Sequence, residues 1–243
     1  MKKYFLLFSF LFASLLTFAQ NDTQAILYSA YQSTDHEQWK KGISLLEQQY
    51  AKSQSDADLL ALAKAEYASF GAFMAHGDKK GAEATADKAA SHTEDYLSRN
   101  KSSAEAHALL SGIYGIQISL SPMKGMTLGT KSSRLIEKAL KIDPDNAFAN
   151  YQRGNSLYFT PKIWGGDVDK AIVHLTKAKA LYEKQGTDNE WEYLGALATL
   201  GQAYHYKEQL KEAKQTYDIA LSTAPDFGWI KYDLLPKLME DMN

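Results

Sequence analysis

The sequence contains no cysteine among its 243 residues. Disulfides and thiolate chemistry are therefore excluded, and so are the usual structural zinc sites, which depend on cysteine ligands. A lipid-modified cysteine behind an export signal is excluded as well. The folded chain must obtain its stability from the packing of its elements.

Patterns that carry catalysis are also missing. The histidines show neither an HExxH motif nor a pair spaced for one helix face: His36, His76, His92, His107, His174 and His205. Gly165-Gly166-Asp167 lacks the further glycines and the lysine of a phosphate loop, so it is better explained as a turn followed by a helix cap. The serines have no nucleophile-elbow context. We therefore expect no enzyme activity, no catalytic residues, no metal site and no cofactor.

Long apolar runs are confined to the N-terminus. Lys2 and Lys3 precede an apolar run from Tyr4 to Leu16, and 17–19 offer the small residues of a cleavage site. This pattern predicts a signal peptide over residues 1–19, cleaved near Ala19. A retained membrane anchor is the alternative, but the run falls short of the roughly 20 residues that a span needs. No later segment predicts a membrane span.

The balance of charge limits the partners. Of 27 basic residues, all but Lys2 and Lys3 remain after cleavage, so 25 face 29 acidic residues. A mild acidic excess argues against nucleic acid or an anionic membrane as the main partner. We expect a soluble exported protein, periplasmic or secreted.

One stretch, from Leu194 to Phe227, has a regular pattern of small and large residues. Glycine and alanine let two helices approach closely, Tyr217 fills the gap between two alanines, and Pro225 ends the second helix. The positions concerned are Leu200, Gly201, Tyr204, Ala213, Tyr217, Ala220 and Pro225. They resemble a tetratricopeptide repeat (TPR), a helical hairpin of about 34 residues.

The resemblance implies an all-α fold, a right-handed α-solenoid of antiparallel helix pairs with about 4–5 hairpins and a C-terminal capping helix. One domain would cover 20–243. Clear repeats are expected at 104–144, 147–184 and 194–227, degenerate repeats at 21–53 and 56–100, and the capping helix at 228–241. We expect that last helix to kink or stop near Pro236.

In TPR proteins the first helix of each pair lines a concave groove, which is where partners bind. The positions that correspond to this groove are Tyr151, Asn155, Tyr158, Gln202, His205 and Tyr206. Aromatic rings and amides suit a peptide or a small polar ligand. The alternative is that the tyrosines simply fill a narrow groove.

One TPR subfamily binds the C-terminal carboxylate of its partners through lysine, asparagine and arginine at fixed groove positions. Asn155 matches one of them, but Tyr151 replaces the lysine, and Gly195 and Thr199 replace the later basic pair. We therefore do not expect this chain to bind chaperone C-termini.

Two repeats have enlarged turns between their helices. The first, Ser119 to Thr127, adds about nine residues before a helix expected from about Thr130, and the second, Phe159 to Asp167, adds about five. Both should emerge on the same edge of the stack. There they would form an apolar patch with a basic rim, made of Met123, Lys124, Met126, Ile163 and Trp164.

Exposed apolar turns on a rigid scaffold are usually interaction sites. The alternative is that their side chains fold back over neighbouring helices. We expect Trp164 to fold back, and Met123 and Met126 to be exposed.

These features predict an exported, non-enzymatic scaffold that binds another protein or peptide of the cell envelope. The alternative is a periplasmic solute-binding accessory of a transport system, because the chain also resembles helical-repeat components of tripartite periplasmic transporters. Those components carry a lipid-modified cysteine, which this chain lacks. A closed cavity lined by Tyr151, Tyr158 and His205 would favour a small ligand, and an open groove with exposed Met123 and Met126 would favour a protein.

Ala220 provides a test of the last predicted repeat. Replacing it with leucine should overpack the contact between the two helices and cost about 1–3 kcal/mol of unfolding free energy. We expect Ala220→Leu to lower the melting temperature of the mature protein. An unchanged melting curve would argue against a repeat at 194–227.

Overall fold

A computed structural model describes residues 23–188 and 190–242, all of them helix or connecting turn. The predicted signal peptide, 1–19, lies outside the described residues. A helix at 23–33 is followed by α2 (His36–Ser53), α3 (Asp56–Ala68), α4 (Phe70–Ala75), α5 (Lys79–Arg99), α6 (Ala104–Leu120), α7 (Gly125–Ile142), α8 (Ala147–Phe159), α9 (Val168–Gln185), α10 (Trp191–Tyr206), α11 (Leu210–Thr223) and α12 (Leu235–Asp241). Short 3-10 turns are η1 (Pro122–Lys124) and η2 (Lys162–Trp164), and η3 (Ile230–Leu234) is a π-helix.

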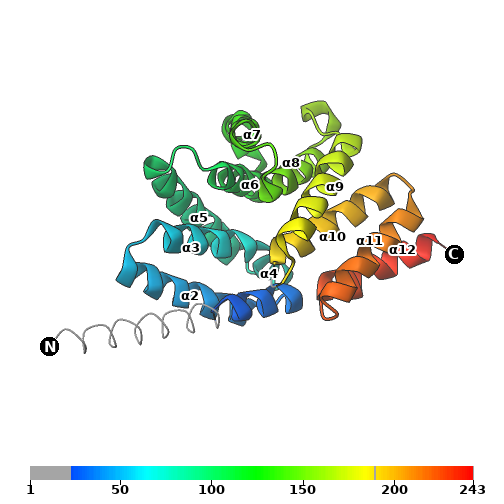
Figure 1. Cartoon of the computed structure of the whole chain (residues 1–243), viewed down its shortest axis with the longest axis horizontal. Helices are drawn as coiled ribbons and strands as arrows, with labels where there is room; N and C mark the ends of the chain where they lie inside the picture. The colour runs from blue at the N-terminus through cyan, green and yellow to red at the C-terminus, as the bar shows by residue number, and fades with distance from the viewer. Residues whose placement is uncertain (1–22, 189, 243) are drawn as a thin grey trace.

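The helices form successive hairpins that stack side by side. The main pairs are α3 with α5, α6 with α7, α8 with α9, and α10 with α11, and each hairpin also packs on the next. Figure 1 shows the hairpins following one another around an arc, from the N-terminal helices in blue to the C-terminal helices in red. The all-α prediction of stacked helix pairs is confirmed. Among the described residues, none of the helices combines the length and apolar character that a bilayer crossing needs.

Polar side chains begin most of these helices. In each case the side-chain oxygen accepts a hydrogen bond from a backbone N–H of the first turn, which would otherwise have no partner. The capping residues are Asp35, Ser55, Asp78, Ser103, Asn146 and Asp167. Asp167 caps α9 as its position after Gly165-Gly166 predicts.

Small residues on one helix receive large side chains from its partner. Tyr217 on α11 is fully buried, and a Cβ atom at Gly201 on α10 would overlap its ring. The same arrangement recurs one hairpin earlier, where a Cβ at Gly154 on α8 would overlap Leu175 on α9. Close approach at glycine is thus the common packing contact of the last two pairs.

The first enlarged turn differs from its prediction. Helix α7 begins at Gly125, well before the expected start near Thr130, so Met126 lies in the first turn of a helix instead of in a loop. Pro122 begins the short η1 turn, and its missing N–H costs nothing at that position. The added residues are thus divided among the end of α6, the η1 turn and the start of α7, with Ser121 between α6 and η1.

Of the two outcomes expected near Pro236, a stop or a kink, the stop does not occur. The helix is continuous from 228 to 241, and the five residues of η3 before Leu235 adopt π-helical geometry. Proline cannot donate a backbone hydrogen bond and clashes with the preceding turn. The wider π-turn accommodates both effects.

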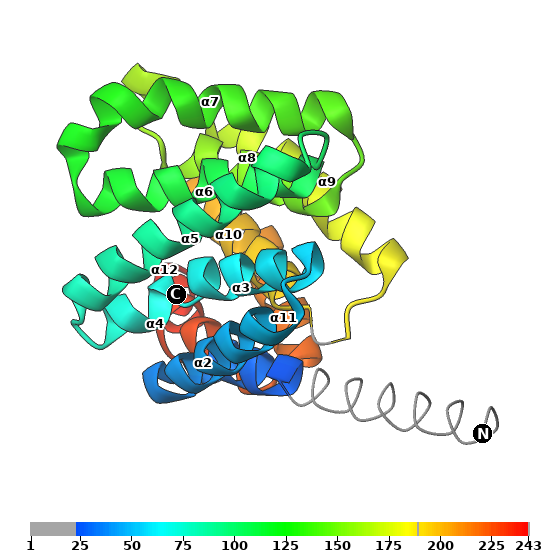
Figure 2. The same cartoon turned by 90° about the vertical axis from the view of Figure 1, so that its left-hand side faces the viewer.

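The two ends of the stack meet. The ring of Tyr31, in helix 23–33, stacks on Phe227 with centroids 5.5 Å apart, and the backbone oxygen of Gln32 lies 3.4 Å from a Cβ placed on Gly228. Figures 1 and 2 both show the N-terminal helices beside the C-terminal ones. The solenoid therefore closes on itself.

Gly201 tests this packing directly. Gly201→Ala should cost about 2–3 kcal/mol, because the added methyl meets the buried, rigid ring of Tyr217. The matched control is Gly115→Ala in α6, where a Cβ meets nothing within 4 Å. That change should leave stability equal or raise it by about 0.5–1 kcal/mol through helix propensity. Denaturant unfolding measures both variants, and equal effects would contradict the account.

Candidate functional site

The middle of the concave groove is filled by the chain itself. Tyr151, one of the predicted groove residues, is buried, and its hydroxyl and that of Tyr31 both lie against Gly195 of α10. The side chain of Asn155, on the next turn of α8, lies close enough to Tyr151 and Tyr67 to affect the pKa of both hydroxyls, and its Oδ1 is buried. Tyr67 in turn exchanges hydrogen bonds with the side-chain amide of Gln152, at 2.8 and 3.1 Å. Neither Tyr151 nor Asn155 therefore lines an open surface.

Burial raises the pKa of Tyr31, Tyr67 and Tyr151, so all three hydroxyls stay protonated and can donate hydrogen bonds. Trp191, at the start of α10, lies against this cluster. Its ring centroid is 5.5 Å from Tyr31 and 6.3 Å from Tyr67. The cluster joins helix 23–33 to α3, α8 and α10.

A partly buried ion-pair network, in which Glu192 is buried, lies next to these rings. The Lys64 Nζ is 2.6 Å from Glu105 Oε1 and 2.6 Å from Glu192 Oε1. Burial alone would lower the pKa of Lys64, but the charges of Glu192 and Glu105 raise it well above its usual value. The network ties α3 to α6 and α10, and its charges are already paired.

The neighbouring carboxyl group of Glu190 is not paired with Lys64, and its pKa is raised. Burial, and then the hydrogen bond and charge of Glu192, raise the pKa of Glu190 to about 8. Burial also opposes ionisation of Glu192, but the charge of Lys64 and the hydrogen bonds from Glu190 and Lys64 together lower the pKa of that residue. Glu190 therefore holds a proton at neutral pH while Glu192 is charged.

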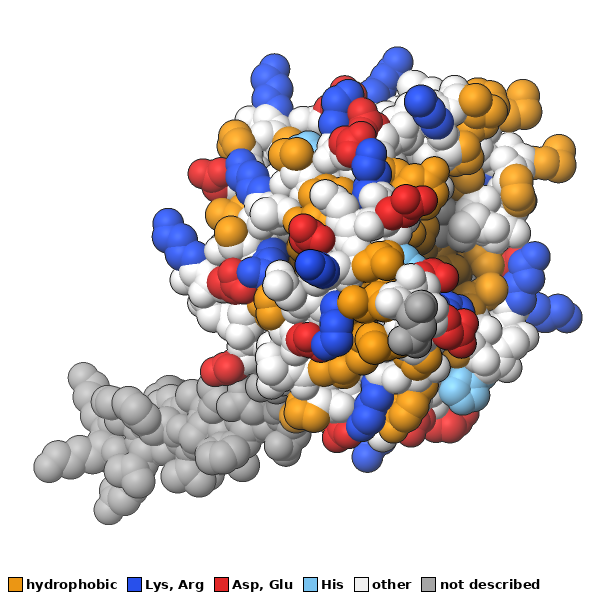
Figure 3. All heavy atoms as spheres, turned by 90° about the vertical axis from the view of Figure 1, so that its right-hand side faces the viewer, with side chains coloured by type: hydrophobic (Ala, Val, Ile, Leu, Met, Phe, Trp, Pro, Cys, Tyr) orange, Lys and Arg blue, Asp and Glu red, His pale blue; other side chains and the backbone are white. Residues whose placement is uncertain are grey.

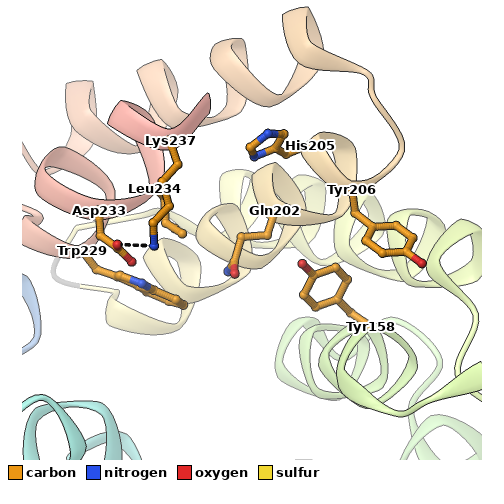
Figure 4. Close-up of a pocket in the computed structure, with 8 residues that line it drawn as sticks. All are labelled: Tyr158, Gln202, His205, Tyr206, Trp229, Asp233, Leu234 and Lys237. Atoms are coloured by element: carbon orange, nitrogen blue, oxygen red, sulfur yellow. Dashed lines mark ion pairs between the residues drawn. The ribbon is translucent and has the colours of Figure 1, made fainter. Parts of the chain in front are cut away.

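The other predicted groove residues gather at the C-terminal end. A cavity of about 530 Å³ lies between α8, α10 and the last helix, and it opens to solvent. We call it the C-terminal groove; its lining residues are Tyr158, Gln202, His205, Tyr206, Trp229, Asp233, Leu234 and Lys237. Figure 4 shows Tyr158 and Tyr206 on one side and the side chains of the last helix on the other.

Half of this lining comes from the last helix, which was expected only to cap the stack. Trp229, Asp233 and Lys237 recur every four residues and so share one helix face. That spacing was the signal that could have identified them.

Polar contacts hold the groove in shape. Lys237 Nζ lies 2.6 Å from Asp233 Oδ1, the ion pair drawn in Figure 4, and His205 Nε2 lies 2.7 Å from Asp241 Oδ2. Burial raises the pKa of Tyr158, so its hydroxyl remains a neutral donor. The groove thus offers aromatic faces and hydrogen-bonding groups, and its charged residues are paired.

The turn edge is the second exposed feature, with Met123 83% and Met126 89% exposed. Trp164 is 76% exposed, so the expectation that it folds back is wrong; its neighbour Ile163 is exposed too. Trp164 belongs to the compact η2 turn, which Gly165 ends with a positive φ of 94° and whose backbone N–H groups bond within the turn. The turn therefore projects the ring away from the helices.

The two enlarged turns emerge on one edge of the stack, as Figure 2 shows. Phe159 is also exposed. Its ring packs edge-to-face on that of Tyr158, with centroids 4.8 Å apart, and so connects this edge to the C-terminal groove. In Figure 3, hydrophobic side chains protrude beside a hollow in the surface. We call Phe159, Ile163 and Trp164 the η2 strip.

Basic residues beside these features are anchored. Lys124 lies 3.7 Å from Asp87 and Lys207 lies 2.9 Å from Asp169, each measured between the amine and a carboxylate oxygen.

Within 23–188 and 190–242, no three His, Cys, Asp or Glu residues are grouped closely enough to hold a metal ion.

Two solved structures have a similar fold. TTC0263, a thermophilic TPR protein of Thermus thermophilus, is 19% identical with a TM-score of 0.59, over 89% of this chain and 99% of its own. The HusA haemophore from Porphyromonas gingivalis is 19% identical with a TM-score of 0.62, over 77% of this chain and 93% of its own. At these identities the likeness shows the fold alone. Neither a scan against protein-family models nor a search of curated proteins found a match.

Glu190 makes stability depend on pH. Its pKa is raised in the folded state, so the folded protein holds a proton that the unfolded chain releases above pH 4.5. Unfolding free energy should therefore fall as pH rises from about 4.5 to about 8. Glu190→Gln should remove that part of the fall and be about 1–2 kcal/mol more stable than the wild type at pH 8, because solvent screens part of the effect at this partly exposed site.

Denaturant unfolding at pH 5 and pH 8 measures this effect. The exposed Glu212→Gln in α11 is the matched control and should follow the wild type at both pH values. The account would be contradicted if both variants showed the same pH dependence.

Proposed function

The chain has the fold of tetratricopeptide-repeat proteins, and we propose that it is an exported, non-enzymatic scaffold that binds another protein or peptide of the cell envelope. It does so through the C-terminal groove and the η2 strip, with Met123 and Met126 farther along the same edge. Proteins of this fold typically act as scaffolds for protein–protein interaction.

The observation that carries the proposal is the exposure of large apolar side chains on rigid turns. Monomeric proteins rarely expose contiguous apolar surface without a function for it. Trp164, with 76% of its surface exposed, is an amphipathic ring of the kind that dominates the binding energy of protein interfaces. It lies on a short, internally hydrogen-bonded turn, which reduces the entropy lost when a partner binds.

The C-terminal groove suits an extended or helical peptide better than an enclosed solute. It is open along one side, and Tyr158, Tyr206 and Trp229 contribute aromatic rings to its walls. Gln202 and the paired His205 add directional hydrogen bonds. A peptide side chain could enter the groove while the adjoining segment lies over the η2 strip.

Export is part of the proposal and rests on the N-terminal sequence alone. Lys2, Lys3 and the following apolar run have the composition of a signal peptide. Cell fractionation, with N-terminal sequencing of the mature protein, would test it, and we expect a mature chain that starts close to Gln20.

A small ligand is the second candidate, as in the solute-binding alternative. The cavity of about 530 Å³ falls within the usual range for small-molecule sites, and one protein of similar fold is a haemophore. A planar, largely apolar ligand could lie against Tyr158 and Trp229. Thermal-shift assays with haemin and with small solutes test this candidate, and a shift that Trp229→Ala abolishes would favour it over a protein partner.

The main test is crosslinking in the native cell envelope, followed by identification of the bound proteins. The double variant Lys124→Ala/Trp164→Ala changes two side chains of the turn edge that contribute nothing to the core. Loss of a central tryptophan at an interface costs about 2 kcal/mol or more, so the affinity for a purified partner should fall by roughly thirtyfold.

The matched control is Val173→Ala/Lys184→Ala on α9, which removes an exposed apolar and an exposed basic side chain elsewhere. It should retain every partner. If Lys124→Ala/Trp164→Ala also retains them all, the turn edge is not the binding surface.

A further inference from the structure

Helix 23–33 occupies the concave side of the repeats that follow it. Its Tyr31 ring stacks on Phe227 at 5.5 Å with an interplanar angle of 28° and lies 5.5 Å from the ring of Trp191. Its hydroxyl lies beside that of Tyr151 on α8, since both approach Gly195. A Cβ on Gly195 of α10 would lie 2.8 Å from the Tyr31 hydroxyl, so the absence of a side chain there makes room for it. Tyr31 thus fills a site formed by α8, α10 and the segment after α11.

We infer that this site is a receptor for an amphipathic helix bearing an aromatic residue, and that the chain's own first helix occupies it until a partner helix takes its place. The inference concerns the middle of the groove, not the C-terminal groove or the turn edge. It goes beyond the proposed function, and either can fail without the other.

Side chains of helix 23–33 contact two hydrophobic clusters. Leu27 and Ala30 are buried in the N-terminal cluster, where Leu27 covers Gly42 of α2. Tyr28 and Tyr31 pack on the main core, and Tyr31 touches both clusters. Leu27, Ala30 and Tyr31, at positions i, i+3 and i+4, therefore connect the N-terminal hydrophobic cluster to the main core. A helix with the same spacing could make the same contacts.

The turn that follows helix 23–33 contains a strained backbone conformation. Thr34 has a positive φ of 54°, a region that β-branched residues avoid. Helix α2 begins directly afterwards, and its cap, Asp35, accepts hydrogen bonds from Glu37 and Gln38 within α2 itself. If helix 23–33 moved away, Thr34 could relax to an ordinary conformation while α2 stayed capped. The strain therefore favours release.

The site is specific for an aromatic side chain. The ring of Phe227 stacks on the Tyr31 ring, the ring of Trp191 lies tilted beside it, and the Tyr151 hydroxyl is near the Tyr31 hydroxyl. The nearby charges of Lys64, Glu105 and Glu192 are paired with one another, so they add no strong demand for a charged ligand. The partner segment is thus a helix with an apolar stripe and a tyrosine.

The probe is a fluorescent peptide with the sequence of residues 23–34, added to the full chain. Wild-type protein should bind it weakly, because its own helix competes at high effective concentration. Tyr31→Ala should bind it at least tenfold more tightly, and a peptide with alanine in place of its second tyrosine should not bind. Circular dichroism should show that the variant keeps its helices.

Because the chain has no cysteine, a single engineered disulfide can hold helix 23–33 in place. Gln32→Cys/Gly228→Cys joins two backbone segments that are in contact, and in the Tyr31→Ala background its disulfide should abolish peptide binding. Reduction should restore binding. Thr34→Asn, which tolerates positive φ, should slow hydrogen exchange of amides 23–33 about fivefold without affecting α6.

Equal peptide binding by wild type and Tyr31→Ala, or binding that survives the disulfide, would overturn the inference. The inference would also be overturned if hydrogen exchange at amides 23–33 occurred only when α2 and α10 unfold. Two copies of the chain could instead form a dimer by exchanging this helix. Such a dimer would contradict the inference, because the partner would then be a second copy of the chain.

Discussion

The structure depends on close approach between helices at glycine, with a large side chain from the neighbouring helix filling the space. Gly201 receives Tyr217 within one hairpin, Gly154 receives Leu175 within another, and Gly195 admits the hydroxyls of Tyr151 and Tyr31 on the concave side. Because the helix axes come close at these points, each hairpin presents a fitted face to the next. The chain has no cysteine for disulfides, so its stability comes from the summed burial at such contacts.

The same constraint determines where binding surface remains. The hairpins curve until Tyr31 of the first helix reaches Trp191 and Phe227 near the end of the chain. That contact fills the middle of the groove, where an open solenoid would accept a ligand. Exposed surface is left at the C-terminal groove, which the last helix completes, and along the edge with the enlarged turns. The last helix is thus both a cap and a wall of the candidate site.

The sequence predicted what local spacing determines. The paired helices around Gly201 and Tyr217 and the cap at Asp167 followed from the order of small, large and polar residues. Tyr158, Gln202, His205 and Tyr206 were named from the repeat pattern and do line one groove. It could not predict that Tyr31 closes the groove over Tyr151, because that contact joins residues far apart in sequence. Nor could it tell whether Trp164 folds back, since the direction of the ring depends on the geometry of η2 and Gly165.

Closure of the stack by Tyr31 is the central claim, and a nuclear Overhauser measurement on a protein with selectively labelled aromatic rings tests it most directly. With centroids 5.5 Å apart, the Tyr31 and Phe227 rings should give cross-peaks between their protons, and so should Tyr31 and Trp191. Their presence would show that the first and last hairpins meet in solution. Absence of both, in a protein whose Tyr31 ring signals are assigned and sharp, would contradict the account.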